Sequence, residues 1–504
     1  MTSSRAGATD QPIDRPSVQG LPLAGRADVL PEHALERIHD GTLRVLDRVG
    51  IELRSDRLIE ALARAGARPD RDARRIRFPP EIVEAALAQV PRTLLLAARD
   101  PAHDLRLDGS HGYLAVDGNA AEILDLDTDE RRPSSKADLA QIARVADALP
   151  QIGLLWQPVA ARDEPTEVQP LHEIATEFAN SSKHVQLMTA TKPEQARAAV
   201  EIARLVAGGE RELRERPVLS AFQCSLSPLT YDGEPLEAAA VYGEAGVPCG
   251  FVAMPIACAT APATPAAALV VSNAEVLAGI VSLQLLVPGA RTFYGSSATV
   301  MDLHTGAAAC GGPEDLLFQL ASAQLARRYG VPSSIGTFAT GAKSADWQAG
   351  VENALSGMAS WLGGADMLGG AGLLYGARVY SIAQLVLDAE LFDLVCRVAG
   401  GVAVTDEDLA LEVIEEVGPG GHFLAQPHTL RNMRRLWRPR TFDRATWEDW
   451  VAAGRPEPRE RARERAREIL AEHAPSPLES SVQEGIRGII GAYAPTETGG
   501  THDG

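Results

Sequence analysis

The chain has 504 residues, of which 45% are hydrophobic and only 5% aromatic, and its formal net charge is −19. This length is compatible with one large barrel plus additions. The net charge argues against nucleic-acid binding, which relies on clustered Lys and Arg. The five cysteines are an odd number and form no CxxC motif. We therefore expect no disulfide framework and a reducing, cytoplasmic compartment.

The first 110 residues divide into a tail and a small module. Residues 1–28 are polar and rich in Pro, Ser, Gly and Asp, and they lack the apolar core of a secretory signal. This composition predicts a disordered tail. Residues 29–110 show helical periodicity, with Ser55 as a candidate N-cap and Gly50 and Gly66 as candidate C-caps. Two short extended segments follow, so we predict an α+β module.

A repeating pattern of short apolar segments and amphipathic helices occupies residues 111–400. A helix can follow each segment, and the spacing of roughly 30–40 residues is typical of successive β/α units. Short buried strands alternating with helices predict a parallel sheet, here closed as a (β/α)8 barrel of the TIM type. The eight predicted strands lie at residues 112–118, 152–160, 184–190, 217–225, 248–257, 292–302, 333–341 and 366–374.

The most apolar long segment runs from Ala266 to Val287 and carries Ser272, Asn273, Glu275 and Gln284. These polar residues favour a buried helix over a membrane span. The pattern changes after about residue 400, where we predict a mostly helical extension over residues 401–494. The last ten residues, 495–504, are predicted to be disordered.

Catalytic chemistry in such a barrel collects just after the carboxyl ends of the strands. Aromatic side chains, methionines, amides and a few charges occur at these positions. That mixture suits a small ligand that is part apolar and part polar, and an aromatic face would attract a quaternary ammonium ion. The candidates for the barrel mouth are Asp117, Asn119, Trp156, Gln157, Met188, Thr189, Gln223, Met254, Tyr294, Ser296, Asp302, His304, Lys343, Asp346, Gln348 and Tyr375.

The stretch Gly369–Gly376, GGAGLLYG, is rich in glycine but matches neither the Walker nor the dinucleotide-binding pattern. We expect Gly370 and Gly372 to let a planar ligand approach the backbone at a strand end. Cysteines and His304 lie on neighbouring predicted units without local ligand spacing, so we expect no bound metal. The GxSxG and HExxH signatures of common hydrolases are absent.

Several segments together resemble the trimethylamine methyltransferase family. The resemblance covers about residues 30–453. It implies a β/α barrel, a methyl acceptor in the form of a corrinoid on a small separate protein, and attack by cobalt(I) on a substrate methyl carbon. The segments that carry the resemblance are residues 125–150, 301–332, 342–354, 385–390, 416–429 and 438–450.

One departure from the family concerns the substrate. Archaeal members that demethylate trimethylamine use pyrrolysine at the barrel mouth, whereas this chain contains only the twenty standard residues. Lys343 is a candidate counterpart. A quaternary ammonium needs no such activation, because it leaves as a neutral amine. We therefore expect a glycine betaine-like donor, whose carboxylate would meet His304, Lys343 or Arg378 and whose ammonium would be balanced by Asp302 or Glu352.

The sequence thus predicts a cytoplasmic, homo-oligomeric methyltransferase that moves a methyl group from a quaternary amine to a partner's corrinoid. Two alternatives stay open: a non-catalytic barrel that binds quaternary amines, and a zinc-dependent methyltransferase acting on a thiol or alcohol. We assign the catalytic role to Asp302, Lys343 and Glu352. The predicted substrate-binding residues are Trp156, Gln157, Gln223, Tyr294, His304, Asp346, Gln348 and Tyr375.

Overall fold

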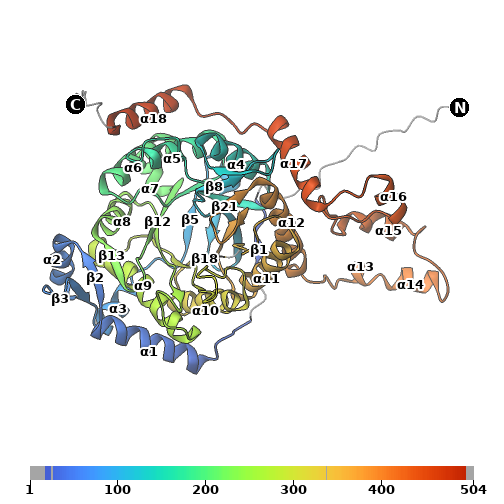
Figure 1. Cartoon of the computed structure of the whole chain (residues 1–504). Coiled ribbons are helices and arrows are strands. Elements are labelled where there is room, and N and C mark those ends of the chain that lie inside the picture. Colours follow the sequence, from blue (N-terminus) through green and yellow to red (C-terminus); the bar gives the residue numbers. More distant parts are fainter. Residues whose placement is uncertain (1–17, 24–26, 337, 495–504) are drawn as a thin grey trace.

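The computed structural model describes residues 18–23, 27–336 and 338–494. Its centre is a closed barrel of eight parallel strands, in which each strand pairs with the next and the last pairs with the first (Figure 1). All eight predicted strands are confirmed. They are β7 (His111–Val116), β10 (Ile152–Trp156), β11 (His184–Leu187), β12 (Leu219–Cys224), β14 (Cys249–Ala253), β16 (Tyr294–Ser296), β18 (Ser333–Gly336) and β19 (Met367–Ala371).

A long helix follows each barrel strand and covers the outside of the barrel (Figure 1). Local signals fix several ends: Ser135 caps α4 through a capping box, and left-handed glycines such as Gly246, Gly330 and Gly364 close α8, α10 and α11. The eight helices are α4 (Lys136–Ala148), α5 (Gln169–Asn180), α6 (Pro193–Ala207), α8 (Gly233–Ala245), α9 (Pro265–Leu286), α10 (Pro313–Tyr329), α11 (Trp347–Gly363) and α12 (Ile382–Ala399).

Helix α9 is the predicted apolar helix, and it is buried in the barrel wall. It is long and apolar enough to cross a membrane, but most of it is covered by the rest of the protein. Its polar residues have partners inside the fold. Glu275 accepts hydrogen bonds from Ser225, Ser227 and the backbone N–H of Leu229, and Asn273 donates to Thr42 and Tyr329. The satisfied polar groups identify a core helix of the barrel.

The residues before the barrel form an α+β module whose small sheet is completed by the barrel itself. Strand β13 (Thr230–Asp232), from the loop after β12, pairs in parallel with β2. Ser55 caps α2 as predicted, accepting a hydrogen bond from the N–H of Leu58. The module contains α1 (Glu32–Arg48), β2 (Ile51–Arg54), α2 (Asp56–Arg64), β3 (Arg68–Asp70), β4 (Arg75–Arg77) and α3 (Pro80–Leu87).

A hairpin of β5 (Leu94–Leu96) and β6 (Leu105–Leu107) closes the amino-terminal end of the barrel. Its leucines belong to the same buried cluster as Phe222, Phe293 and Met367 of the barrel. The backbone carbonyl of Ala97 lies 2.8 Å from Nδ1 of His184 at the start of β11. With this end filled, ligands reach the barrel interior from the carboxyl ends of the strands.

The predicted disordered tail needs a correction where it enters the described residues. Strand β1 (Leu21–Pro22) pairs antiparallel with the start of β7, and Leu21 is fully buried. Burial of leucines explains the order, because residues 18–23 supply apolar contacts that the mainly polar composition of the tail does not suggest. The N–H of Ala27, also within the predicted tail, donates to the carbonyl of Leu362. Residues 1–17, 24–26 and 495–504 of the predicted tails lie outside the described residues.

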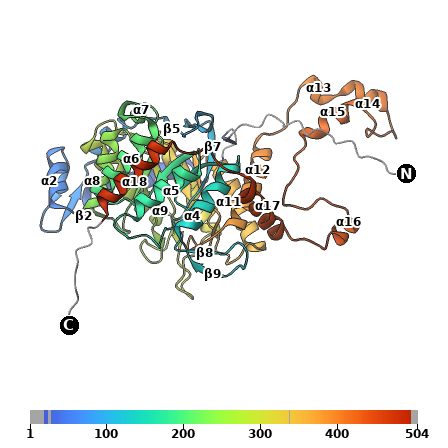
Figure 2. The same ribbon diagram turned by 90° about the horizontal axis from the view of Figure 1, so that it is seen from above.

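Short elements lie at both ends of the barrel, and helices follow the barrel in the chain. Helix α17 packs on α12 and α4, and α18 packs on α6. Figure 2 shows α13 to α16 standing away from the barrel. The short elements are η1 (Pro101–His103), β8 (Glu122–Leu124), β9 (Arg131–Pro133), α7 (Glu210–Glu215), β15 (Ile256–Ala257), β17 (Thr299–Val300), β20 (Leu373–Leu374) and β21 (Val379–Ser381). The final helices are α13 (Asp406–Leu409), α14 (Leu411–Val417), α15 (Pro427–Asn432), η2 (Met433–Arg435), α16 (Trp447–Ala452), α17 (Pro458–Glu472) and α18 (Ser480–Tyr493).

Candidate active site

A cavity opens at the carboxyl ends of the barrel strands, with an empty volume of about 1040 Å³ that includes its part open to solvent. Its wall is mainly apolar and sulfur-bearing. Trp156, Met188, Met254 and Phe318 supply the large side chains. The charged groups among the described lining residues are two carboxyls, Asp117 and Asp315, and no Lys, Arg or His lines the wall. Such a wall suits a cation better than an anion.

Asp117 and Trp156 lie side by side at the ends of β7 and β10. Both flank Gly369 of β19, whose missing side chain leaves space for the Asp117 carboxyl and the Trp156 ring. Trp156 stacks on Phe222 with ring centroids 4.4 Å apart, and its indole Nε1 is buried without a hydrogen-bond partner in the described protein. Burial raises the pKa of Asp117 to about 8. The cavity thus holds a carboxyl that is largely protonated at neutral pH.

The second carboxyl, Asp315, was not singled out from the sequence. It lies in the first turn of α10, accepts a hydrogen bond from the N–H of Gly311 at 2.9 Å, and lines the same cavity. Burial raises its pKa to about 7. An acidic residue in the first turn of a helix is common, so the sequence carried no signal that separated Asp315 from an ordinary helix-terminal acid.

Glu352 supports the loop at the cavity edge. Its Oε2 accepts hydrogen bonds from the hydroxyl of Thr340 and, at 2.9 Å, from the backbone N–H of Gly341, while Oε1 accepts from Gln348 at 2.8 Å. Glu352 and Gln348 therefore hold a loop in place, and neither lines the cavity. Asp346, whose Oδ1 accepts from the N–H of Gln348 at 2.9 Å, is the exposed N-cap of α11.

Two of the three predicted glutamines, Gln157 and Gln223, lie behind the cavity wall. Gln157 is fully buried, donates to Glu173 at 3.1 Å and accepts from the N–H of Met188 at 3.1 Å. It therefore positions Met188, a lining residue, without lining the cavity itself. Gln223 is also buried and outside the lining, and its Oε1 has no hydrogen-bond partner in the described protein.

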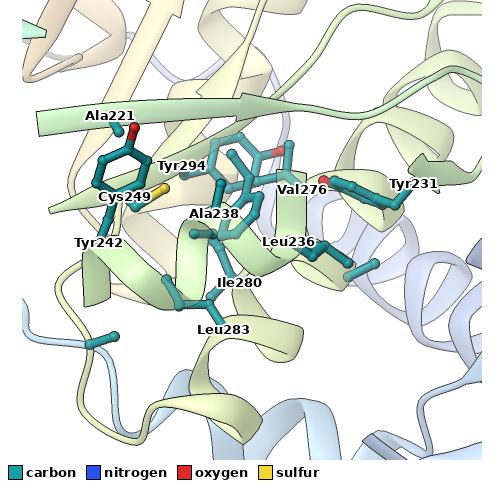
Figure 3. Close-up of a cluster of buried hydrophobic side chains, with 14 of the residues drawn as sticks. Ala221, Tyr231, Leu236, Ala238, Tyr242, Cys249, Val276, Ile280, Leu283 and Tyr294 are labelled. Atoms are coloured by element: carbon teal, nitrogen blue, oxygen red, sulfur yellow. The ribbon is translucent and has the colours of Figure 1, made fainter. Parts of the chain in front are cut away.

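The predicted place of Tyr294 at the mouth is wrong. Tyr294 faces outward from β16 and donates a hydrogen bond to Oδ1 of Asn273 on α9 at 3.1 Å. Figure 3 shows it among Tyr242, Cys249 and Val276 in a buried cluster. It is fully buried between the barrel and its helices, so it is remote from any ligand in the cavity.

Tyr375 lies at the rim, and its ring is surrounded by the protein's own cations. Lys343 Nζ lies 4.8 Å from the ring centroid, Arg378 5.5 Å and Arg131 6.0 Å. Lys343 is exposed and donates to the backbone carbonyl of Gly341 at 2.6 Å. Neither Tyr375 nor Lys343 lines the cavity, so the cation–π partners of this tyrosine are side chains of the chain itself.

Asp302 and His304 lie in a turn beyond β17 and outside the cavity lining. Asp302 accepts hydrogen bonds from the backbone N–H groups of His304, at 2.7 Å, and Thr305, at 3.4 Å. The side chain of His304 is exposed. Asp302 thus stabilises the turn, which is the usual role of Asp at such a position.

Of the two predicted glycines, Gly370 lines the cavity and Gly372 does not. Both have positive φ, 107° for Gly370 and 92° for Gly372. A side chain at position 370 would approach the backbone of Phe338 to about 2.9 Å, and one at 372 would collide with the ring of Tyr380. Glycine is therefore required for packing at both positions. Gly376, Ala377, Ala339 and Ala308 also line the cavity, so part of its wall has no side chain beyond Cβ.

Metal ligation finds no support in this geometry. Among residues 18–23, 27–336 and 338–494, no group of three or more His, Cys, Asp or Glu side chains is placed to hold a metal ion. Cys249 is buried, Cys258 is exposed, and burial raises the pKa of Cys310 to about 11. A thiol with a raised pKa is a poor source of the thiolate that zinc binds.

Comparison with known proteins decides the family. The model of the trimethylamine methyltransferase family matches residues 3–492. The chain belongs to this family. It is 35% identical over 473 residues to the trimethylamine methyltransferase MttB of Desulfitobacterium hafniense, covering 94% of both chains. It is 34% identical over 471 residues to a glycine betaine methyltransferase of the same species, covering 93% of this chain and 97% of the relative.

A solved structure of the Methanosarcina barkeri monomethylamine methyltransferase MtmB superposes with a TM-score of 0.48 at 12% identity, covering 94% of this chain and 96% of that chain. Membership of the family makes the protein a methyltransferase, as the sequence predicted. In this chain, the large and charged side chains that meet at the carboxyl ends of the strands are Asp117, Trp156, Met188, Met254, Asp315 and Phe318.

Proposed function

We propose that this methyltransferase transfers a methyl group from a small quaternary amine to a reduced corrinoid carried by a partner protein. The observation that carries the proposal is the cavity wall, in which an indole ring, two methionines and a phenyl ring surround two desolvated carboxyls. Quaternary ammonium ions are held by aromatic faces and by a nearby anion, and this wall offers both.

The two carboxyls give the cavity its preference for a cation. Burial keeps Asp117 largely protonated and Asp315 about half protonated in the free protein near neutral pH, since their pKa values are raised to about 8 and about 7. An ammonium ion close to either carboxyl favours its ionised form. Binding therefore releases a proton and forms an ion pair in a poorly hydrated cavity, where the attraction is stronger than in water.

The charge on the substrate also favours the chemistry. When the carbon–nitrogen bond of a quaternary ammonium breaks, nitrogen keeps the bonding pair and leaves as a neutral tertiary amine, so no acid is needed. The electron pair for the methyl carbon comes from the reduced corrinoid, which supplies the nucleophile. The residues of this chain bind the ammonium, orient one methyl group toward the mouth and exclude water.

The mouth fits the approach of a planar macrocycle held by another protein. Gly370, Gly376, Ala377, Ala339 and Ala308 line the cavity and have no side chain beyond Cβ. Together they would form the contact with the corrinoid edge. This arrangement supports a carrier protein that docks at the barrel mouth.

The more specific prediction is a glycine betaine-like donor. Whether this donor fits depends on how the protein would bind its carboxylate. The cavity wall matches its trimethylammonium group. The carboxylate would need a donor, and the buried indole N–H of Trp156 is one without a partner. Lys343 and Arg378 at the rim are charged donors farther out. The glycine betaine methyltransferase relative supports this donor, and the trimethylamine methyltransferase relative supports a methylamine.

The proposal is tested with purified protein, cobalamin reduced to the cobalt(I) state and a panel of quaternary amines with and without a carboxylate. We expect at least one donor to lose a methyl group, with the tertiary amine and methylated cobalamin appearing in equal amounts by mass spectrometry. Calorimetric binding of the panel without any tertiary amine would instead indicate the non-catalytic binder. Neither binding nor product with the whole panel would refute the proposal.

A further inference from the structure

Residues 401–440, here called the arm, leave the barrel after α12 and return to it before α17. The arm carries α13, α14, α15 and η2 (Figures 1 and 2). None of its 40 residues is buried. It rejoins the body through Trp437, which donates to Asp393 at 2.8 Å, and through the backbone N–H of Arg440, which donates to Glu390 at 2.7 Å. The arm therefore has no core of its own.

The arm is nevertheless rich in exposed apolar side chains. Of the 22 large hydrophobic side chains that are exposed in the described chain, ten lie within it. Val402 is 87% exposed, Leu424 86% and Leu430 72%. Single exposed hydrophobic residues need no explanation, but this density in one segment is typical of a surface that another molecule covers.

Charge in the arm is divided between its two halves. Residues 401–420 contain six acidic residues and no Lys or Arg, whereas residues 421–440 contain five Arg and no acidic residue. One ion pair joins the halves within the chain, between Arg435 and Asp408 at 2.9 Å. Asp406, Glu412 and Arg431 take part in no ion pair in the described structure. The arm is thus complementary to a copy of itself turned end for end.

We propose that the arm is a dimerisation element that pairs with the arm of a second copy of this chain. The pairing is two-fold symmetric, so the acidic half of each arm lies on the basic half of the other. A two-fold contact places the same surface on both partners and closes at two copies. The apolar side chains of both arms are buried between them, which stabilises the contact, and the charges set its direction.

A corrinoid carrier is a competing occupant of the arm, because the proposed function requires such a partner. Recognition of an unrelated protein does not call for opposite charges in the two halves of one segment. A two-fold contact does call for them, since each half must match the other. The charge division therefore favours a second copy, and the carrier becomes an outcome of the test.

The test is a charge exchange in the full-length protein. One variant reverses the net charge of the acidic half by Asp406→Lys, Glu407→Lys, Glu412→Lys, Glu415→Lys and Glu416→Lys, and the other reverses that of the basic half by Arg431→Glu, Arg434→Glu and Arg438→Glu. The Arg435–Asp408 pair is untouched in both. By sedimentation velocity, we expect the wild type at twice the chain mass of 53.5 kDa and each variant alone at 53.5 kDa.

Mixing the two variants decides the proposal. In a mixed dimer the reversed acidic half meets the reversed basic half, and the two native halves also meet, so the dimer mass should return. A wild type that stays at 53.5 kDa at micromolar concentration overturns the proposal, as does a variant pair that fails to recombine although both fold by circular dichroism. If the arm binds only a corrinoid carrier, the wild type alone should stay at 53.5 kDa.

A second pair of variants tests the apolar contact. Leu430→Asp should lower the dimer affinity at least tenfold, whereas Leu303→Asp should leave it unchanged. The two leucines are both 72% exposed, but Leu303 lies in the turn beyond β17, outside the arm. Equal dimerisation of both variants and the wild type would contradict burial of the arm, independently of whether methyl transfer is observed.

Discussion

The carboxyl of Asp117 occupies the space where a side chain of Gly369 would lie. A Cβ atom at position 369 would overlap Oδ2 of Asp117 and approach Cζ3 of Trp156 to 3.6 Å. The absence of a side chain on β19 therefore lets a carboxyl from β7 and an indole from β10 meet in the cavity. The close packing at Gly369 therefore positions the two side chains that we propose bind the ammonium group.

Gly369→Ala should reduce methyl transfer without unfolding the barrel. The added methyl group displaces the Asp117 carboxyl, and a misplacement on the order of 1 Å can cost about 100-fold in rate. The steady-state rate with the preferred donor measures the effect. Gly350→Ala on α11 is the matched control, because nothing lies within 4 Å of a Cβ at that position. A Gly369→Ala variant as active as Gly350→Ala would show that the contact is unimportant.

Binding of a quaternary ammonium should strengthen as the pH rises toward 8. Below that value the Asp117 carboxyl is protonated in the free protein, because burial raises its pKa to about 8. The cation prefers the ionised form, so binding must release a proton. The affinity then rises up to about tenfold per pH unit between pH 6 and 8 and levels off above.

Titration calorimetry of this pH dependence, in buffers with different ionisation enthalpies, reports both the affinity and the number of protons released. Asp117→Asn should bind more weakly at pH 9 and lose the pH dependence between pH 7 and 8, whereas the dependence that Asp315 contributes below pH 7 remains. Asp302→Asn removes a carboxyl that stabilises a turn outside the cavity and serves as the control. An affinity that is flat from pH 6 to 9 in the wild type would contradict the role of Asp117.

Trp156→Leu should weaken binding of the donor, because the indole supplies the main aromatic face of the cavity. A desolvated cation–π contact contributes about 1–2 kcal/mol, which corresponds to a loss of about 5–30-fold in affinity. Calorimetry at pH 8 measures this loss. Trp447→Leu removes an exposed tryptophan on α16 and should leave binding unchanged. Equal affinity of both variants would place the ligand elsewhere.

Tyr294→Phe should leave donor binding and methyl transfer unchanged but lower stability. The hydroxyl donates to Asn273 in the core, and losing one such hydrogen bond costs about 1 kcal/mol. Chemical denaturation measures the change in the free energy of unfolding. A clear loss of affinity in a folded Tyr294→Phe protein would restore this residue to the site and contradict its outward orientation.

The barrel could be predicted from the sequence because its signals are local. Apolar segments such as residues 152–156 alternate with helices, several of which are closed by glycine, and each unit repeats the same order. The hairpin of β5 and β6 could be seen only as two extended segments, since its role as a plug depends on contacts with distant strands. Strand β1 was not predicted either. It has only two residues, which are too few to show a periodic pattern, and its pairing partner β7 is distant in the sequence.

The candidate site was harder to predict, because a barrel strand is buried on both faces. Trp156 points into the cavity and Tyr294 points toward α9, yet both belong to strands whose residues are all buried. Alternation of polar and apolar residues is therefore absent, and it could not tell the inner face from the outer. Lys343, Asp346 and Tyr375 follow strands in sequence, but their loops carry them to the rim, and loop paths have no periodic signal.

The central claim is that a permanently charged nitrogen, held beside Asp117 and Trp156, is what this enzyme demethylates. The most direct measurement compares tetramethylammonium with trimethylamine as methyl donors to cobalt(I) cobalamin at a pH above the ordinary pKa of trimethylamine, where trimethylamine is mostly uncharged, followed by absorbance in wild type and Asp117→Asn. We predict transfer from tetramethylammonium at a rate at least about tenfold above that from trimethylamine, and loss of this difference in the variant. Equal or faster transfer from trimethylamine, with no effect of the variant, would contradict the account.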